Sequence, residues 1–151
     1  MAPESSTETY AQVYNRSLTD PEGFWADQVA GIPWIVTPEN ILDKDQNGVW
    51  RWFSDGVLNS CHVALDQHVA AGRGDQPALI YDSPVTGEIQ HFTYAQLLEK
   101  TAITAGGLVD LGVGKGDVVV IYMPMVPETV AAMLACARIG AILSVVFGGF
   151  A

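Results

Sequence analysis

The chain has 151 residues, of which 49% are hydrophobic and 16% charged, a composition typical of a globular protein. Its 17 acidic and 7 basic residues give a net charge of -10, and the basic residues are scattered along the chain. Binding to nucleic acid or to an anionic membrane surface therefore lacks its electrostatic requirement, and neither partner is expected.

No segment of the sequence reads as a targeting signal or a membrane span. The start of the chain, MAPESSTETYAQ, has neither the basic nor the apolar region of a secretory signal and no Arg of a transit peptide. The longest apolar run, Val118 to Val126, contains Pro124 and is too short to span a bilayer. We expect a cytoplasmic protein in which Cys61 and Cys136 are buried free thiols, with a disulfide as the alternative.

The first third of the chain predicts two short helices and a small strand after a polar tail of residues 1–8. Asp20 followed by Pro21 is an N-cap with Pro at the first helical position, and it opens the second helix. The stretch DKDQNG predicts a turn, and VWRWF predicts a short strand after it. Four tryptophans lie here, and we interpret them as the contact that fastens an extended segment to a neighbouring domain. A ligand site is the alternative. The four are Trp25, Trp34, Trp50 and Trp52.

The middle of the chain predicts a helix, a β-hairpin and a second helix. LNSCHVALDQHVAAG has helical periodicity that ends at Gly72. PALIYDSPVTGEIQHFTY predicts strands at 78–82 and 89–93, joined by a turn. Thr93 can cap the following helix, which Gly112 ends.

The last third predicts one βαβ unit. DVVVIYMP is a continuous apolar run typical of a strand buried on both faces of a parallel sheet. PETVAAMLACARIG predicts a helix, and ILSVVF a second parallel strand. The fold class is therefore α/β: an N-terminal helical extension, a β-hairpin and a first βαβ unit. Because two parallel strands do not form a stable sheet alone, we expect this chain to be the front part of a longer protein.

Two motifs that suggest chemistry have simpler explanations. GVGKGD, residues 112–117, lacks the Ser or Thr that follows Lys in a phosphate-binding loop, and it joins a helix to a strand. It is predicted to be a turn. His62 and His68 are six residues apart, which does not suit a shared metal ion on a helix. We predict no catalytic residue and no metal ligand in this chain.

Phe147, Gly148 and Gly149 follow the second parallel strand and form the candidate binding site. The carboxyl end of a parallel strand is where open α/β sheets bind ligands, and glycine lets a backbone approach closely. The alternative is a tight turn that only reverses the chain, and the residues themselves favour neither reading.

Several stretches resemble the AMP-forming short-chain acyl-CoA synthetases, the acetyl-CoA and propionyl-CoA branch of the acyl-adenylate-forming superfamily. FTYAQLLEKTAITAGGLVDLGVGKGD and LACARIGAILSVVFGGF resemble the first two core motifs of their large domain. DPEGFWADQ, RWFSDGVLNSCHVALDQHV and GRGDQPALIYDSPVTG resemble the N-terminal extension of this branch, and YDSPVTG leans toward propionyl-CoA synthetase. The departures are His62-Val63 in place of Tyr-Asn and Gln67 in place of Arg.

The resemblance divides the chain into a tail (residues 1–8), an extension (9–72) and the start of the AMP-binding large domain (73–151). It implies a two-step reaction in the parent protein. Propionate or acetate attacks the α-phosphate of ATP to give an acyl-adenylate and pyrophosphate, and the CoA thiol then displaces AMP. Magnesium would help to offset the phosphate charge.

The resemblance also implies how the site and the isolated chain behave. In the family, the Phe-Gly-Gly stretch borders the channel for the pantetheine arm of CoA, which assigns this role to Phe147, Gly148 and Gly149. The phosphate loop, nucleotide contacts and terminal lysine of such proteins lie downstream of Ala151. We therefore expect this chain alone to be inactive, to bind no cofactor and to self-associate through exposed strands. The alternatives are an interaction module that docks through its open sheet edge, and a truncated product without its own function.

Overall fold

Short-range capping contacts define the first two helices of the computed structural model, which describes residues 8–148. Helix α1 (Tyr10–Thr19) begins at a capping box in which Thr9 and Gln12 each bond the other's backbone. Helix α2 (Pro21–Val29) begins at Asp20, whose carboxylate accepts the backbone N–H of Gly23. The two predicted helices and the Asp20 cap are confirmed.

A short hairpin follows in the same compact unit, which ends at Leu58. Strands β1 (Leu42–Lys44) and β2 (Trp50–Trp52) pair antiparallel; the predicted turn and the strand within VWRWF are present, whereas β1 was not predicted. The Asp45 carboxylate holds the turn because it accepts backbone N–H groups at 2.9 and 3.0 Å and the Arg51 guanidinium at 2.9 Å. These hydrogen bonds, first the one from the Val49 backbone, lower the pKa of Asp45.

The tryptophans of this unit contact one another and their neighbours. Trp25 on α2 meets Trp52 on β2 edge to face at 6.0 Å between ring centroids. Trp34 lies 5.9 Å from Phe53 and donates its indole N–H to the Val29 carbonyl at 3.1 Å. The rings therefore join α2 to the hairpin inside the unit. Their proposed role in fastening this segment to a neighbouring domain stays a prediction.

The second compact unit begins at Asn59 and opens with the predicted helix, part of which is π-helical. Two π-helical stretches, η1 (His62–Asp66) and η2 (Val69–Arg73), lie within it. The hairpin of β3 (Pro77–Ser83) and β4 (Glu88–Thr93) follows, and Thr93 caps helix α3 (Tyr94–Asp110). The predicted helix, hairpin and cap are all present.

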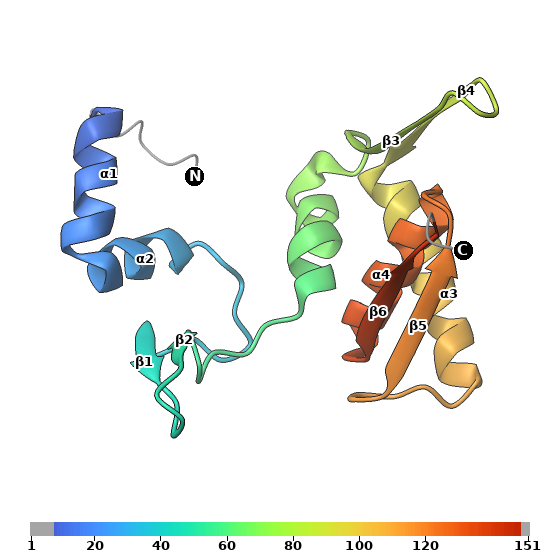
Figure 1. Ribbon diagram of the computed structural model, residues 1–151. Helices are drawn as coiled ribbons and strands as arrows, with labels where there is room; N and C mark the ends of the chain where they lie inside the picture. Colours follow the sequence, from blue (N-terminus) through green and yellow to red (C-terminus); the bar gives the residue numbers. More distant parts are fainter. Residues whose placement is uncertain (1–7, 149–151) are drawn as a thin grey trace. The chain divides into compact units, whose positions relative to one another are not determined.

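The βαβ unit is also present, and Figure 1 shows it at the orange and red end of the chain. Strands β5 (Val118–Met123) and β6 (Ile142–Phe147) pair parallel and in register along their whole lengths, from Val118 opposite Ile142 to Met123 opposite Phe147. Helix α4 (Pro127–Ile139) makes the crossover. The described residues thus comprise a smaller unit and, after it in the sequence, an incomplete α/β domain.

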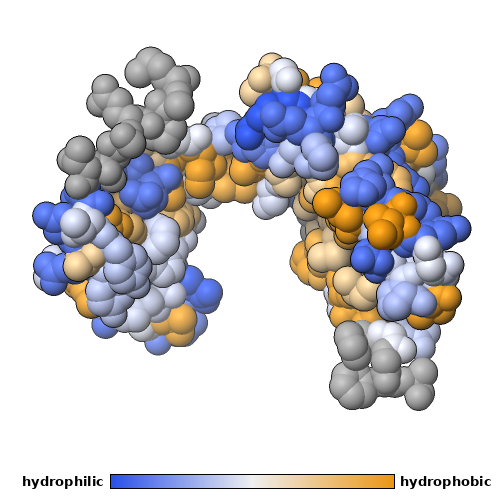
Figure 2. All heavy atoms as spheres, turned by 90° about the horizontal axis from the view of Figure 1, so that it is seen from above, coloured by the Kyte–Doolittle hydropathy of each residue, from blue (hydrophilic) through white to orange (hydrophobic). Residues whose placement is uncertain are grey.

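The prediction that β5 is buried on both faces is wrong for the chain that the structure describes. Ile121 is 3% exposed and packs in one cluster with Cys136 of α4, but Val118, Val120 and Tyr122 are 63%, 64% and 62% exposed. Alternate residues of a strand point to opposite faces, and α4 packs against only one of them. Figure 2 shows hydrophobic residues, coloured orange, exposed among hydrophilic ones on the surface of the molecule.

Two small apolar clusters form the core of the second unit. Cys61 and Leu65 of the helical stretch pack with Leu97 of α3. Cys136 packs with Ile121 and with residues that follow α4. Both cysteines are buried and free, as predicted, and burial raises the pKa of each thiol.

A bidentate ion pair ties the helical stretch to α4. The guanidinium of Arg138 donates to the two carboxylate oxygens of Asp66 at 2.9 and 3.0 Å and reaches the sulfur of Cys61 at 3.5 Å. The amide of Asn59 donates to the backbone carbonyl of Arg138 at 2.9 Å. Since both charged side chains are mostly covered, the pair is stronger than a surface ion pair.

We predict that Arg138→Met lowers the free energy of unfolding by about 2 kcal/mol, because it leaves the Asp66 carboxylate without its charged donor. Urea denaturation measures the change. Arg51→Met is the matched control, since the Arg51 side chain is 57% exposed and its pair with Asp45 should contribute less than about 1 kcal/mol. Equal losses in the two variants would contradict the prediction.

Candidate functional site

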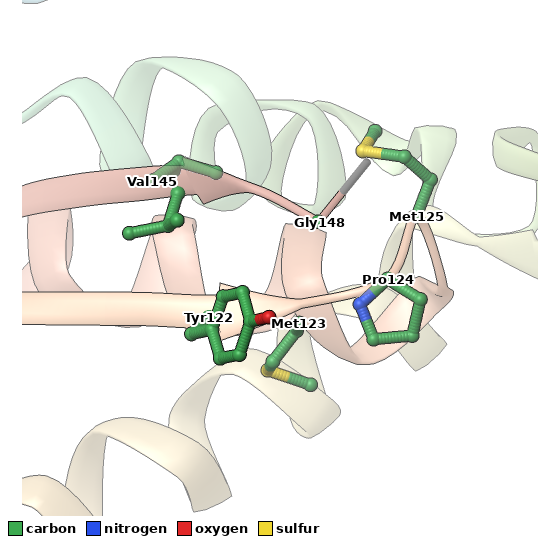
Figure 3. A pocket seen from close by; sticks show the side chains of 7 residues that line it. Tyr122, Met123, Pro124, Met125, Val145 and Gly148 are labelled. Atoms are coloured by element: carbon green, nitrogen blue, oxygen red, sulfur yellow. The ribbon is translucent and has the colours of Figure 1, made fainter. Parts of the chain in front are cut away.

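A hollow of about 550 Å³ lies at the carboxyl ends of the two parallel strands. Figure 3 shows Tyr122, Met123 and Pro124 on β5 and the turn after it, with Val145 and Gly148 from β6 and the residue that follows. The hollow forms here because parallel strands end at the same edge of a sheet. Among the described residues, the lining is Tyr122, Met123, Pro124, Met125, Val145, Val146 and Gly148.

The turn between β5 and α4 is fixed by hydrogen bonds to one carbonyl group. The carbonyl oxygen of Pro124 accepts the backbone N–H of Val126 at 2.9 Å and the hydroxyl of Thr129 at 2.6 Å. Thr129 is 1% exposed, so its hydroxyl has little access to water. This side of the hollow is therefore held by the first turn of α4.

Among the described lining residues, the structure places the predicted site residue Gly148 at the hollow. The backbone of Phe147 ends β6 and pairs with Met123 in the strand register, and Gly149 lies outside the described residues. A Cβ atom on Gly148 would lie 3.7 Å from the Met123 carbonyl oxygen, an ordinary contact. The fold of the described chain therefore does not itself require glycine at 148.

The residues that end β5 were missed by the sequence reasoning. Tyr122, Met123 and Met125 line the hollow, although no motif marks them. Their position could have been predicted, because the expected parallel pairing places the carboxyl end of the first strand beside that of the second. The lining residues that the structure describes carry no carboxylate, imidazole, thiol or amine, and most of their side chains are apolar.

The other predicted motifs have structural roles. Residues 112–117 are a turn between α3 and β5, in which Asp117 accepts the backbone N–H of Gly114 at 2.8 Å. The ring of His68 packs against Tyr94 at 4.8 Å between centroids and bonds Arg73. Burial is the main cause that lowers the pKa of His68, and the nearby guanidinium adds to it.

A second hollow of about 560 Å³ lies along β4 and α3. Its lysine, Lys100, donates to Glu128 at 2.7 Å, and this hydrogen bond lowers the pKa of Glu128.

Across residues 8–148, no three His, Cys, Asp or Glu side chains are placed to hold a metal ion together. Within the same residues, no helix has the length and apolar character needed to cross a membrane.

Family models match nearly the whole chain, one after the other. Residues 10–64 match the acetyl-coenzyme A synthetase N-terminus, and residues 66–151 match the AMP-binding enzyme family. The chain therefore belongs to the AMP-binding enzyme family. Within this family it corresponds to the N-terminal portion of the AMP-forming short-chain acyl-CoA synthetases, as the sequence resemblance indicated.

Curated relatives and a solved structure agree with this assignment. The chain is 49% identical over 142 residues to the human mitochondrial acyl-CoA synthetase short-chain family member 3 and 47% identical over 140 residues to the acetyl-coenzyme A synthetase of Streptomyces coelicolor. These matches cover 94% and 93% of this chain and 21% of each relative. An acetoacetyl-CoA synthetase structure from Streptomyces lividans matches with a TM-score of 0.80 and 30% identity, covering 95% of this chain and 22% of that one. The chain thus spans about a fifth of the length of these relatives.

We predict that Thr129→Val destabilises the turn that borders the hollow by about 1 kcal/mol, because the Pro124 carbonyl loses one of its two donors. The measurement is the shift of the urea midpoint. Thr104→Val is the control, since its hydroxyl bonds only a carbonyl of its own helix, four residues earlier, at a half-buried position. If both variants shift the midpoint equally, the Thr129 hydroxyl has no special role.

Proposed function

We propose that this chain is the N-terminal portion of an ATP-dependent, AMP-forming short-chain acyl-CoA ligase. The observation that carries the proposal is the ordered match of both family models along one chain. In the proposed reaction, a carboxylate oxygen attacks the α-phosphorus of ATP and pyrophosphate leaves. The CoA sulfur then attacks the acyl carbonyl, AMP leaves with the electrons of the broken bond, and the thiol proton passes to solvent.

The proposed acid substrate is propionate or acetate. The relatives support a short acid, since their names are acetyl-CoA, acetoacetyl-CoA and short-chain acyl-CoA synthetase. The stretch YDSPVTG, which covers the turn of the β3–β4 hairpin, favours propionate by its resemblance. ATP, CoA and Mg²⁺ are the proposed cofactors of the parent protein. The described residues offer no metal-ligand cluster, so we assign no magnesium ligand to them.

We propose that Phe147, Gly148 and Gly149 border the path of the pantetheine arm of CoA. Support comes from Gly148, which lines an open, largely apolar hollow at the carboxyl edge of the sheet.

The boundary between extension and large domain at residues 72 and 73 also stays a prediction, as does the cytoplasmic compartment. The human relative is named as mitochondrial.

A second candidate is an interaction module without catalysis. It is favoured by the exposed face of β5, where Val118, Val120 and Tyr122 are uncovered in the described chain. The same face could promote self-association of the isolated 151 residues. We give this candidate second place, because the family match also extends through the residues of this face.

The first test is ATP–pyrophosphate exchange with propionate and with acetate. We predict activity for the longest reading frame that includes these 151 residues and none for the 151 residues alone. The reason is that the resemblance assigns the phosphate loop, the nucleotide contacts and the terminal lysine to parts of the parent protein other than these 151 residues. Exchange in neither protein would favour the interaction module, and exchange in the short chain would refute its predicted inactivity.

The second test is Gly149→Leu in that longer protein. We predict that acyl-CoA formation falls about a hundredfold, because a side chain in the path of the pantetheine arm would misplace the thiol. Pyrophosphate exchange should stay unchanged, since adenylation precedes CoA binding at this path. Gly106→Leu, at an open helical position with no atom within 4 Å of the added Cβ, is the control. Loss of exchange together with acyl-CoA formation would reject the assignment of Gly149.

A further inference from the structure

The turn of the β1–β2 hairpin contains a reactive pair of neighbours, Asn47 and Gly48. Gly48 has a φ of 75°, and no atom lies within 4 Å of the position that a Cβ atom would take. Its backbone nitrogen therefore has no side chain of its own to shield it. This nitrogen can close a succinimide ring when it attacks the amide carbon of the Asn47 side chain, the first step of deamidation.

The hydrogen bonds of the turn oppose this attack. The N–H of Gly48 donates to the carbonyl oxygen of Asp45 at 2.9 Å. The carboxylate of Asp45 accepts the backbone N–H groups of Asn47 and Val49 at 2.9 and 3.0 Å, and the guanidinium of Arg51 at 2.9 Å. The nitrogen of Gly48 becomes a nucleophile only when it loses the proton that it donates here. The closed turn thus suppresses the reaction, and local opening of the hairpin permits it.

We propose that Asn47 is a deamidation site whose rate is set by opening of the Asp45 turn. Hydroxide takes the proton of the Gly48 nitrogen, which bonds the amide carbon of Asn47, and the side-chain nitrogen leaves as ammonia. Water then adds to one of the two succinimide carbonyls, the ring bond at that carbonyl breaks, and residue 47 becomes aspartate or isoaspartate. The inference goes beyond the proposed function and does not depend on it.

The product changes the hairpin that holds it. A carboxylate at position 47 stands beside the carboxylate of Asp45, and like charges at close range repel. The same hairpin carries Trp52, which meets Trp25 of α2, so a loosened turn weakens the contact between the hairpin and this helix. We expect Asn47→Asp, which copies one product, to lower the urea midpoint relative to the neutral Asn47→Ser. Equal midpoints would overturn this consequence.

The test follows deamidation in the longest reading frame that includes these 151 residues, at mildly alkaline pH. Trypsin releases residues 45–51 as one peptide, and mass spectrometry detects the conversion of its amide to an acid. Labelling by an isoaspartyl methyltransferase identifies the isoaspartate product. We expect Asn47 to react about tenfold faster in the urea-denatured chain than in the folded one, and about tenfold faster in folded Asp45→Ala than in the unchanged protein.

Asn40 provides a control inside the same chain. It is followed by Ile41, whose β-branched side chain crowds the attacking nitrogen, and its side-chain amide donates to Asp55 at 3.0 Å. Asn40 should remain unconverted in the folded protein and in Asp45→Ala. Faster reaction at Asn40 than at Asn47 would overturn the assignment of the site.

A second variant covers the case in which Asp45→Ala unfolds the hairpin. Arg51→Met removes the guanidinium from the Asp45 carboxylate and keeps every backbone donor, so its rate should lie between those of the folded and denatured protein. Absence of conversion at Asn47 in the denatured chain would overturn the site. Equal rates in the folded and denatured chain, or in the unchanged protein and both variants, would overturn control by the turn.

Discussion

The parallel pairing of β5 with β6 is the constraint on which the rest of the second unit depends. Two parallel strands that follow each other in sequence must be joined by a crossover, and α4 supplies it in 13 residues. This connection brings both carboxyl ends to one edge, where Gly148 meets the end of β5. Because α4 packs on the face that carries Ile121, the opposite face stays uncovered in the described chain. The hollow and the exposed face thus have a single topological cause.

The ion pair of Asp66 with Arg138 extends this arrangement to the start of the unit. Arg138 stands in the last turn of α4, and Asp66 stands on η1, 72 residues earlier in the chain. The bidentate geometry fixes the orientation of the helical stretch as well as its distance from α4. Cys61 and Cys136 behave as small apolar residues, each in its own cluster. The Asp66–Arg138 ion pair and the two apolar clusters together hold the partly π-helical stretch against the βαβ unit.

Both compact units of the chain carry features of one class of protein, whereas the hollow belongs to the second unit. The family models and relatives establish the class, and they cover both compact units of the chain. The hollow is a feature of the tertiary structure, and its described lining is apolar apart from Tyr122.

The sequence by itself determined the elements and their type. The caps at Asp20 and Thr93, the turn at Asp45 and the glycine that ends α4 act through neighbours within a few residues, so local patterns predict them. The family was also readable from the motifs alone. The tertiary structure decided which face of β5 is buried, that the helix after Asn59 has π-helical turns, and that Tyr122 and Met125 share a hollow with Gly148. Those features depend on contacts between residues far apart in sequence, and a local pattern of apolar residues carries no information about them.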